Sequence, residues 1–228
     1  MLILAIDSSS RTGSVALLRG NQVMAEFSIR TDANHAATIL LSIQKVLDYC
    51  EAKVKDIGLI ALTTGPGSFT GLRIGASTVK GLALPYSTPV AGISTLEALA
   101  YNAMPSRVDI CPLLDAKKNE IYTAIYRTGA NGLPELKEFE RVTEPRGFIS
   151  QLSDDVLFLG DGVQKYADLL EELCPVRAAF APGHLQFIRA SAVALLGMEK
   201  FNRRQTVDLL TFIPRYLRLS QAEVNLTG

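Results

Sequence analysis

The chain repeats one order of elements in its two halves, and this repeat constrains the fold more than any other feature of the sequence. In the first half, the apolar run Leu2–Ile6 ends at Asp7, and a polar turn leads into SVALLRG and VMAEFSIR. In the second half, DICPLL ends at Asp115, and the turn AKKN leads into EIYTAIYR and LKEFERV. Short apolar or alternating runs between turn residues predict strands. We therefore expect each half to begin with a meander of three strands.

Helices and further strands complete each half. Asn34 is a suitable helix cap, and apolar residues after it return at helical spacing as far as Cys50. We then expect a strand at IGLIAL, a helix to about Leu84, a strand at PVAGI and a helix from Thr95. The second half predicts a strand at VLFLG, helices over 163–173 and 185–200, and an extended tail at TFIPRYLR.

Two α/β halves that each begin with a meander and a strand-end aspartate are typical of the duplicated actin-like ATPase fold, also called ASKHA or RNase H-like. We expect a first subdomain over 1–105 and a second over 106–228, with the C-terminal helix free to pack back onto the first. In this architecture the two strand–turn segments hold the phosphates of a nucleotide. The second lobe is reduced, however, and leaves few residues to hold an adenosine.

Composition is typical of a globular protein and argues against a nucleic-acid-binding surface. Of the 228 residues, 48% are apolar, which is enough for a sizeable core, and 23 basic residues balance 23 acidic ones. Proteins that bind nucleic acids by their phosphates carry an excess of Lys and Arg. We therefore do not expect this chain alone to bind RNA or DNA.

The cysteines and the N-terminal residues indicate the cellular compartment. Cys50, Cys111 and Cys174 are far apart and form no CxxC pair, so we expect reduced thiols rather than a disulfide or a zinc site. The start MLILAIDSSS has no basic lead and reaches an aspartate after six residues, which argues against a signal peptide or a membrane span. We therefore expect a cytoplasmic protein without membrane association.

The segment TTGPGSFTGLRIG, over 63–75, suggests a phosphate-binding loop but does not match one. A Walker loop requires GxxxxGK[ST], and the segment lacks both the lysine and the hydroxyl at those positions. Ser68 and Thr70 precede an apolar helix and are suited to cap its N-terminus. Free amide groups at a helix start also attract anions, and this is the secondary interpretation of the loop.

Glycines within the following helix indicate close packing. Gly71, Gly75 and Gly81 each cost the helix about 1 kcal/mol relative to alanine. Gly71, Gly75, Thr78 and Leu82 fall on one helical face, where a second backbone can approach closely. Composition leaves two alternatives open, because the close neighbour is either another part of the monomer or another subunit.

The candidate ligands and nucleophiles form no recognisable metal or catalytic site. His35 lacks a second ligand one helical turn later, because Ile39 occupies that position, and His184 lies in a predicted loop. The serines after Asp7 lack the GxSxG elbow, and no cysteine has a histidine nearby in sequence. We therefore expect no catalytic residue, no metal and no cofactor.

Residues at the strand ends are candidates for a nucleotide site. Asp7 and Asp115 occupy the places where ATPases of this architecture position magnesium and water, although a strand-end carboxylate also serves local hydrogen bonds. Gly160 and Gly162 flank a strand–helix turn, where glycine also serves the backbone alone. We expect these four residues and Ser8 to form a degenerate nucleotide site.

Six segments resemble the bacterial TsaB family, also called YeaZ. They occur in the family's order and span nearly the whole chain: ILAIDSSSRTGSVALL, NHAATILLSIQKVL, TTGPGSFTGLRIG, LLDAKKNEIYTAIY, LGDGVQKY and IPRYLR. The resemblance implies a role in forming N6-threonylcarbamoyladenosine at position 37 of tRNAs that read codons starting with A. It implies a non-catalytic subunit related to the transferase TsaD. The metal-binding relatives carry two helical histidines four residues apart, and His35 with Ile39 departs from that pattern.

The resemblance also implies partners and an interface. TsaD is the implied catalytic partner, the ATPase TsaE is a second partner, and the same face forms a homodimer when TsaD is absent. The chain reaches tRNA only through this complex. The implied interface lies on the helix after Asn34 and on the glycine-containing helix, whose glycines admit the partner. Its expected residues are His35, Thr38, Ile39, Ser68, Phe69, Thr70, Gly71, Arg73, Gly75 and Thr78.

A second function from another class stays open. The actin-like superfamily includes ATP-dependent kinases of small molecules and acyl groups, and the alternative is such an enzyme with its own active site. Tight ATP binding with turnover by the isolated chain favours this alternative. Because no hydrolytic set of residues is present in the sequence, we do not expect a protease.

Overall fold

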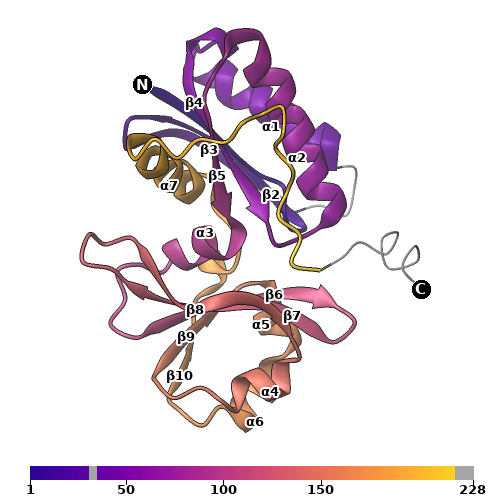
Figure 1. Ribbon diagram of the computed structural model, residues 1–228, viewed down its shortest axis with the longest axis vertical. Coiled ribbons are helices and arrows are strands. Elements are labelled where there is room, and N and C mark those ends of the chain that lie inside the picture. Colours follow the sequence, from indigo (N-terminus) through magenta and orange to yellow (C-terminus); the bar gives the residue numbers. More distant parts are fainter. Residues whose placement is uncertain (31–34, 219–228) are drawn as a thin grey trace. The chain divides into compact units, whose positions relative to one another are not determined.

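The computed structural model describes residues 1–30 and 35–218, with side chains for all of these except 35 and 36, and it divides into two compact units (Figure 1). Unit 1 comprises Met1–Ala98 and Ile188–Gly228, and unit 2 comprises Leu99–Phe187. The segment after residue 187 therefore belongs to unit 1, whereas the sequence assigned it to the second subdomain. The C-terminal helix contacts the strands of the first sheet.

In the described part of unit 1, five strands form one mixed sheet. They are β1 (Leu2–Asp7), β2 (Thr12–Arg19), β3 (Gln22–Arg30), β4 (Ile57–Gly65) and β5 (Val90–Ser94). The order across the sheet is β3-β2-β1-β4-β5, with β1 to β3 antiparallel and β4 and β5 parallel to β1. The predicted meander and the predicted strands at IGLIAL and PVAGI are confirmed.

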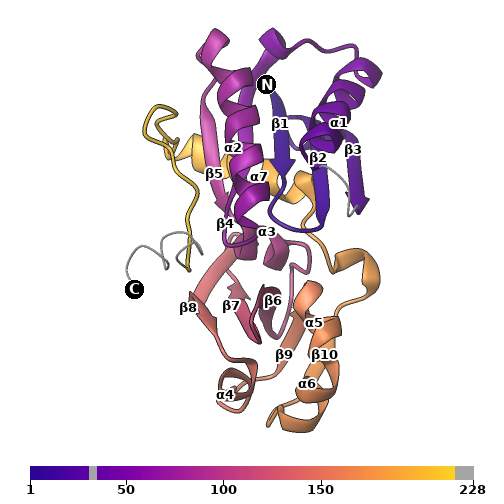
Figure 2. The same ribbon diagram turned by 90° about the vertical axis from the view of Figure 1, so that its right-hand side faces the viewer.

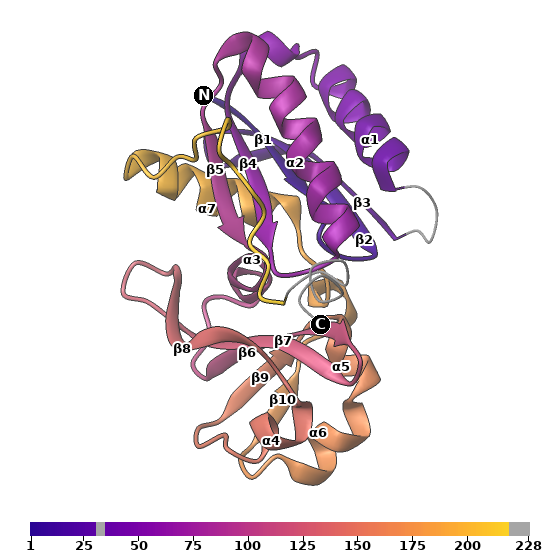
Figure 3. The ribbon, with the colours of Figure 1, turned by 45° about the vertical axis from the view of Figure 1, so that its right-hand side comes forward.

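Helices cover both faces of this sheet (Figures 1 and 3). The helices α1 (His35–Tyr49) and α2 (Phe69–Ala83) pack on one face, and α7 (Ala190–Asn202) crosses the other. Between α1 and α2, Ile39, Ile43 and Val79 join inward residues of the strands in one buried core. The shorter elements of unit 1 are 3-10 turns at Val54–Asp56 and Leu84–Tyr86 and the start of α3 (Thr95–Tyr101).

A row of alanines explains how α7 approaches the sheet closely. Ala16, Ala5, Ala61 and Ala91 are partners in register across β2, β1, β4 and β5, so their side chains share one face. All four are buried. On α7, a Cβ placed on Gly197 would lie only 2.5 Å from Ala61 Cβ. Small side chains on both surfaces thus bring the helix backbone down onto the strands.

Unit 2, whose residues are all described, repeats the topology of unit 1. Its strands are β6 (Asp109–Lys117), β7 (Glu120–Thr128), β8 (Pro134–Thr143), β9 (Val156–Leu159) and β10 (Ala178–Phe180). The order β10-β9-β6-β7-β8 has the same pattern as the first sheet, with an antiparallel meander followed by parallel strands. The helices are α4 (Pro145–Ile149), α5 (Asp161–Lys165) and α6 (Ala167–Leu173), with a 3-10 turn at Gly183–Leu185. The duplication inferred from sequence is therefore present in the fold.

Two predicted helices differ from the observed ones. The helix predicted over 163–173 is interrupted at Tyr166, whose backbone leaves helical geometry at φ −113° and ψ 20° and separates α5 from α6. The last helix begins at Ala190 rather than at residue 185. Its start is fixed by the Glu26 carboxylate of β3, which accepts hydrogen bonds from Ser191 N and Oγ, both at 2.8 Å.

The remaining comparisons with the sequence concern short elements and the tail. The elements α4 and β10 have five and three residues and were not predicted. Residues 206–218 form neither helix nor strand, so the predicted absence of helix at TFIPRYLR is confirmed, but the segment includes turns at 209–211 and bends at 217–218. Asn34, the predicted cap of α1, lies outside the described residues. Among the helices in the described ranges, none has the length and apolar character needed to cross a bilayer.

Candidate functional site

The segment over 63–75 forms the end of β4, a loop and the first half of α2. Ser68 caps the helix as predicted, because its Oγ accepts a hydrogen bond from Gly71 N at 3.2 Å. Gly65 has a φ of +117°, and a Cβ there would overlap the carbonyl oxygen of Arg215 in the C-terminal tail. The loop therefore requires glycine for its backbone and for the tail that crosses it.

The glycine face of α2 packs against the turn that follows β1. A Cβ on Gly71 would overlap the carbonyl oxygen of Ser8, and a Cβ on Gly75 would overlap Ser8 Oγ. The same contact includes two hydrogen bonds, from Ser8 Oγ to Gly71 O at 2.8 Å and from Ser68 N to Ser9 O at 2.7 Å. The close neighbour of these glycines is therefore the serine turn of the same unit.

This contact corrects part of the predicted interface. Gly71 and Gly75 are buried inside unit 1, so the prediction that they make room for a partner is wrong. Ile39 is 2% exposed and belongs to the core between α1 and the sheet. Gly81 differs from the other two, because it is exposed and has open space around its Cβ position. Thr38 is half-buried, and the side chain of His35 lies outside the described part of the chain.

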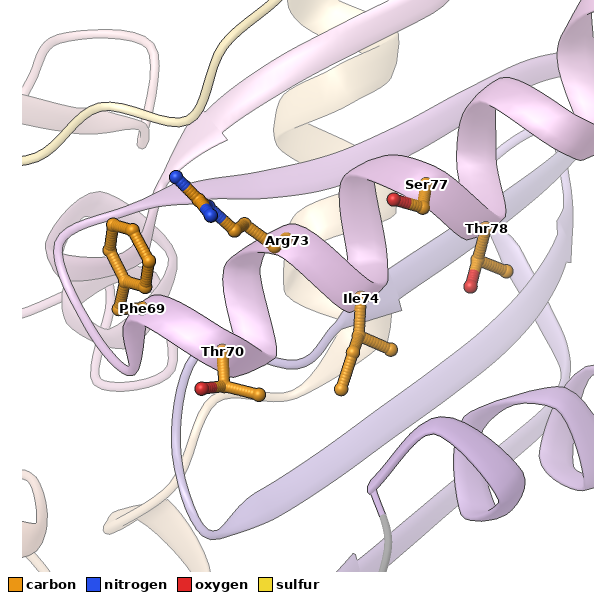
Figure 4. Close-up of a pocket in the computed structure, with 6 residues that line it drawn as sticks. All are labelled: Phe69, Thr70, Arg73, Ile74, Ser77 and Thr78. Carbon is orange, nitrogen blue, oxygen red and sulfur yellow. The ribbon is translucent and has the colours of Figure 1, made fainter.

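The outer side of α2 lines an open groove of about 460 Å³ (Figure 4), which includes Thr78, a residue that helical spacing had placed with the glycines. Three pairs of adjacent residues, repeated every four residues along the helix, line the groove: Phe69, Thr70, Arg73, Ile74, Ser77 and Thr78. Four of these residues were predicted for the interface, and with Ser68 they are exposed or half-buried. Ile74 and Ser77 were missed, although helical spacing from Thr70 and Arg73 places them on this face.

Apolar residues on the neighbouring helix are exposed as well. Leu40 and Leu41 of α1 are 53% and 62% exposed, and α1 packs beside α2 on the same face of the sheet (Figure 2). Large apolar side chains rarely gather on a surface without a binding role. The helix pair therefore presents two exposed leucines on α1 and, on α2, a groove with one aromatic and one cationic side chain.

The N-terminal end of the groove carries an ordered arginine. The Arg73 guanidinium lies over the Phe69 ring, with 4.0 Å between Cζ and the ring centroid. Its Nε donates a hydrogen bond to Tyr216 Oη at 3.4 Å, and the Phe69 and Tyr216 ring centroids are 4.8 Å apart. The C-terminal tail thus contributes a side chain to the surface of α2, which sequence reasoning did not predict.

Asp7 in unit 1 has the local role that the sequence allowed. The carboxylate is fully buried, and its Oδ1 accepts hydrogen bonds from Ser9 N at 3.1 Å, Ser9 Oγ at 2.6 Å and Thr63 Oγ1 at 2.7 Å. These donors join the end of β1 to its own turn and to β4. The predicted hydrogen bonds into the serine turn are therefore confirmed.

Asp115 in unit 2 is engaged by two lysines. Its carboxylate accepts hydrogen bonds from Lys117 N at 3.0 Å, Lys117 Nζ at 2.8 Å and Lys165 Nζ at 2.8 Å. Partial burial opposes ionisation of Asp115, but the hydrogen bonds from the lysines outweigh it and lower its pKa to about 2. At neutral pH the carboxylate is charged and already paired.

The glycines of the predicted nucleotide site are required by the backbone of unit 2. Gly160 has a φ of +114°, and a Cβ there would overlap the carbonyl oxygen of Leu113. The same carbonyl oxygen would lie 3.0 Å from a Cβ on Gly162. The two glycines therefore let the turn before α5 and the first residues of α5 approach β6, and this packing accounts for their presence without a ligand.

Comparisons with known proteins identify the family. A protein-family model described as "TsaD: tRNA N6-adenosine threonylcarbamoyltransferase" matches residues 23–226. The tRNA threonylcarbamoyladenosine biosynthesis protein TsaB of Bacillus subtilis (strain 168) is 32% identical, over 98% of this chain and 96% of that protein. The TsaB protein of Escherichia coli (strain K12) is 33% identical, over 100% and 99%. The chain belongs to the TsaB family.

Solved structures confirm the fold of this TsaB-family chain. YeaZ from Pseudomonas aeruginosa has a TM-score of 0.80 and 26% identity, covering 95% of this chain and 99% of that one. An inorganic polyphosphate/ATP-glucomannokinase from Arthrobacter sp. strain KM has a TM-score of 0.51 at 10% identity and shares the fold alone. The predicted duplicated actin-like α/β fold is therefore confirmed.

The three cysteines are thiols that form no disulfide with one another. Burial raises the pKa of the Cys111 thiol to about 12. A thiol with this pKa stays protonated at neutral pH and is a poor nucleophile or metal ligand. Among residues 1–30 and 35–218, no three His, Cys, Asp or Glu side chains are placed to hold a metal ion.

Proposed function

We propose that this chain acts in forming N6-threonylcarbamoyladenosine at position 37 of tRNAs that read codons starting with A. Its part is that of a non-catalytic subunit, and it binds and activates the transferase TsaD. The similarity to TsaB proteins along the full length of both chains supports the pathway. The state of the two strand-end aspartates supports the non-catalytic role, because the chain's own groups already engage both carboxylates.

The partner surface that we propose is the outer face of α1 and α2. It retains Thr38, Ser68, Phe69, Thr70, Arg73 and Thr78 from the sequence prediction and adds Leu40, Leu41, Ile74 and Ser77. Phe69 and Arg73 are of the residue types that are enriched at protein–protein interfaces, and the exposed leucines of α1 add apolar surface. TsaD binds this face, and a second copy of the chain covers it when TsaD is absent. TsaE joins the assembled complex, which brings the cytoplasmic chain to tRNA.

A charge placed on the exposed part of this surface tests the proposal. Leu41→Glu introduces a carboxylate at a site that is 62% exposed, so folding stability should change by no more than about 0.5 kcal/mol. Desolvation of the new charge at an interface should lower the affinity for purified TsaD at least tenfold. Titration calorimetry measures the affinity, and a reconstituted assay with TsaD and TsaE measures tRNA modification.

A matched control separates interface loss from a general effect of the charge. Phe139 on β8 is 85% exposed and belongs to unit 2, whereas the helix pair belongs to unit 1. Phe139→Glu therefore makes the same kind of substitution outside the proposed surface. We expect Phe139→Glu to bind TsaD and support modification like the parent. If Leu41→Glu binds TsaD as tightly as Phe139→Glu and the parent do, the interface lies elsewhere. If the parent chain itself does not bind TsaD, the proposed function is wrong.

A further inference from the structure

The Arg73 cluster consists of Phe69, Arg73 and Tyr216, and it is built from segments far apart in the sequence. Phe69 and Arg73 lie in the first two turns of α2, and Tyr216 lies in the C-terminal tail. Backbone contacts hold the tail near this place, because Arg215 N donates to Thr64 O at 2.7 Å. The hydrogen bond between Arg73 Nε and Tyr216 Oη then links the tail to α2.

The cluster restrains an exposed guanidinium by a ring contact and a long hydrogen bond. An arginine side chain on a surface normally loses rotamer entropy when it binds a partner. Here the Phe69 ring supports one face of the guanidinium at 4.0 Å, and Tyr216 accepts a hydrogen bond from Nε. These two contacts restrict the rotamers of Arg73 before any partner binds, and they reduce the entropy that the side chain loses on binding.

The remaining donors of Arg73 are arranged for an anionic acceptor. Guanidinium carries five N–H groups, and the bond to Tyr216 uses only the one on Nε. The other four N–H groups lie on the two terminal nitrogens. One N–H group from each of these nitrogens pairs with one oxygen of a carboxylate in fork geometry. Within residues 1–30 and 35–218, the Arg73 guanidinium has no carboxylate partner.

We propose that Arg73 receives an aspartate or glutamate side chain of the partner transferase at the N-terminal end of the groove. This inference rests on the proposed function and assigns the chemistry of one contact within it. A carboxylate of a protein fits better than an RNA phosphate, because the other groove residues are Phe69, Thr70, Ile74, Ser77 and Thr78. All five are uncharged, whereas a surface for RNA requires several cations in a row.

Substitutions at Arg73 with a matched control test the inference. Arg73→Gln removes the charge from the groove, whereas Arg19→Gln removes one from the exposed end of β2. We expect Arg73→Gln to raise the Kd for TsaD at least tenfold and Arg19→Gln to change it less than twofold. Arg73→Lys should also weaken binding severalfold, since an ammonium group offers no fork and stacks less well on Phe69. Equal affinities for Arg73→Gln and the parent would overturn the inference while leaving the proposed function intact.

The tail residue should act through Arg73. Tyr216→Phe keeps the ring and removes the hydroxyl that orients Nε, so it should weaken TsaD binding less than Arg73→Gln does. In the double variant, Tyr216→Phe should cost no further affinity, because the guanidinium it positions is gone. Additive losses in the double variant would show that Tyr216 contacts the partner independently and would overturn its role as a positioning residue.

A zero-length cross-link identifies the acceptor. Carbodiimide joins an amine to a carboxylate in direct contact, so the Arg73→Lys variant mixed with TsaD should give one peptide linked through the introduced amine to an aspartate or glutamate. A reversed charge at that TsaD residue should then restore binding to Arg73→Glu. If the complex forms but no linked peptide is found, the proposed carboxylate acceptor is wrong. It is also wrong if the isolated chain binds tRNA and Arg73→Gln abolishes that binding. A parent chain that does not bind TsaD would refute the proposed function and this contact together.

Discussion

Replacement of Gly71 by alanine tests whether the glycines of α2 serve the fold of unit 1. The added methyl would overlap the carbonyl oxygen of Ser8, which is a backbone atom and has no alternative rotamer. The Ser8 Oγ hydrogen bond to Gly71 O lies in the same contact and would be disturbed as well. Gly81 on the same helix provides the control, because its Cβ position has no heavy atom within 4 Å.

The two substitutions should change stability in opposite directions. In a helix interior, alanine is more favourable than glycine by about 1 kcal/mol, and this gain applies at both positions. At Gly71 the overlap costs about 1–3 kcal/mol, and loss of the Ser8 hydrogen bond costs about 1 kcal/mol more. We therefore expect Gly71→Ala to lower the free energy of unfolding by about 1–3 kcal/mol and Gly81→Ala to raise it by about 1 kcal/mol.

Urea denaturation followed by far-ultraviolet circular dichroism measures both effects. The parent, Gly71→Ala and Gly81→Ala chains are compared at one protein concentration at which all are monomeric. Below its unfolding transition, Gly71→Ala should still bind TsaD with the affinity of the parent, because the methyl is buried inside unit 1. If Gly71→Ala is as stable as Gly81→Ala, or folds normally but loses TsaD binding, the packing argument is refuted.

Three further predictions concern other parts of the chain. Gly197→Val should lower the free energy of unfolding by about 1–3 kcal/mol, because the new side chain meets Ala61; stability unchanged in urea would contradict the close contact of α7. Asp115, with its pKa lowered from 3.8 to about 2, should contribute about 1–2 kcal/mol above pH 4 that is lost as the pH falls toward 2; Asp115→Asn should remove this pH dependence of unfolding and leave tRNA modification largely intact. The purified chain should bind no stoichiometric metal and hydrolyse no ATP; micromolar ATP affinity by calorimetry with turnover would favour a kinase instead.

The sequence predicted the elements whose patterns are local. Alternation and apolar runs located the strands of both meanders, and helical spacing located α1 and α2, because these patterns depend on neighbouring residues only. The start of α7 could not be predicted, since the group that fixes it is Glu26 on β3, 165 residues before Ser191 in sequence. The break at Tyr166 has no proline or glycine at the residue itself to mark it.

The candidate site divides in the same way. The glycines of α2 indicated a close contact, but composition could not tell which backbone fills it, and Ser8 lies 63 residues before Gly71. Four of the six groove residues were named through the family resemblance, whereas Ile74 and Ser77 were missed although helical spacing from Thr70 and Arg73 places them on the same face. The contribution of Tyr216 depends on the path of the tail across the sheet, and no local pattern encodes that path.

The insertion of unit 2 into unit 1 has a consequence for synthesis on the ribosome. All five strands of the first sheet emerge before unit 2, whereas α7, which covers the alanine row, emerges after it. Unit 2 is continuous in sequence and has its own core. Its core residues are therefore all synthesised before α7, the last described helix of unit 1. Domains usually fold in the order of their synthesis. In this chain the first-made sheet is the last to be closed, and its small-residue face stays open to solvent and chaperones until α7 arrives.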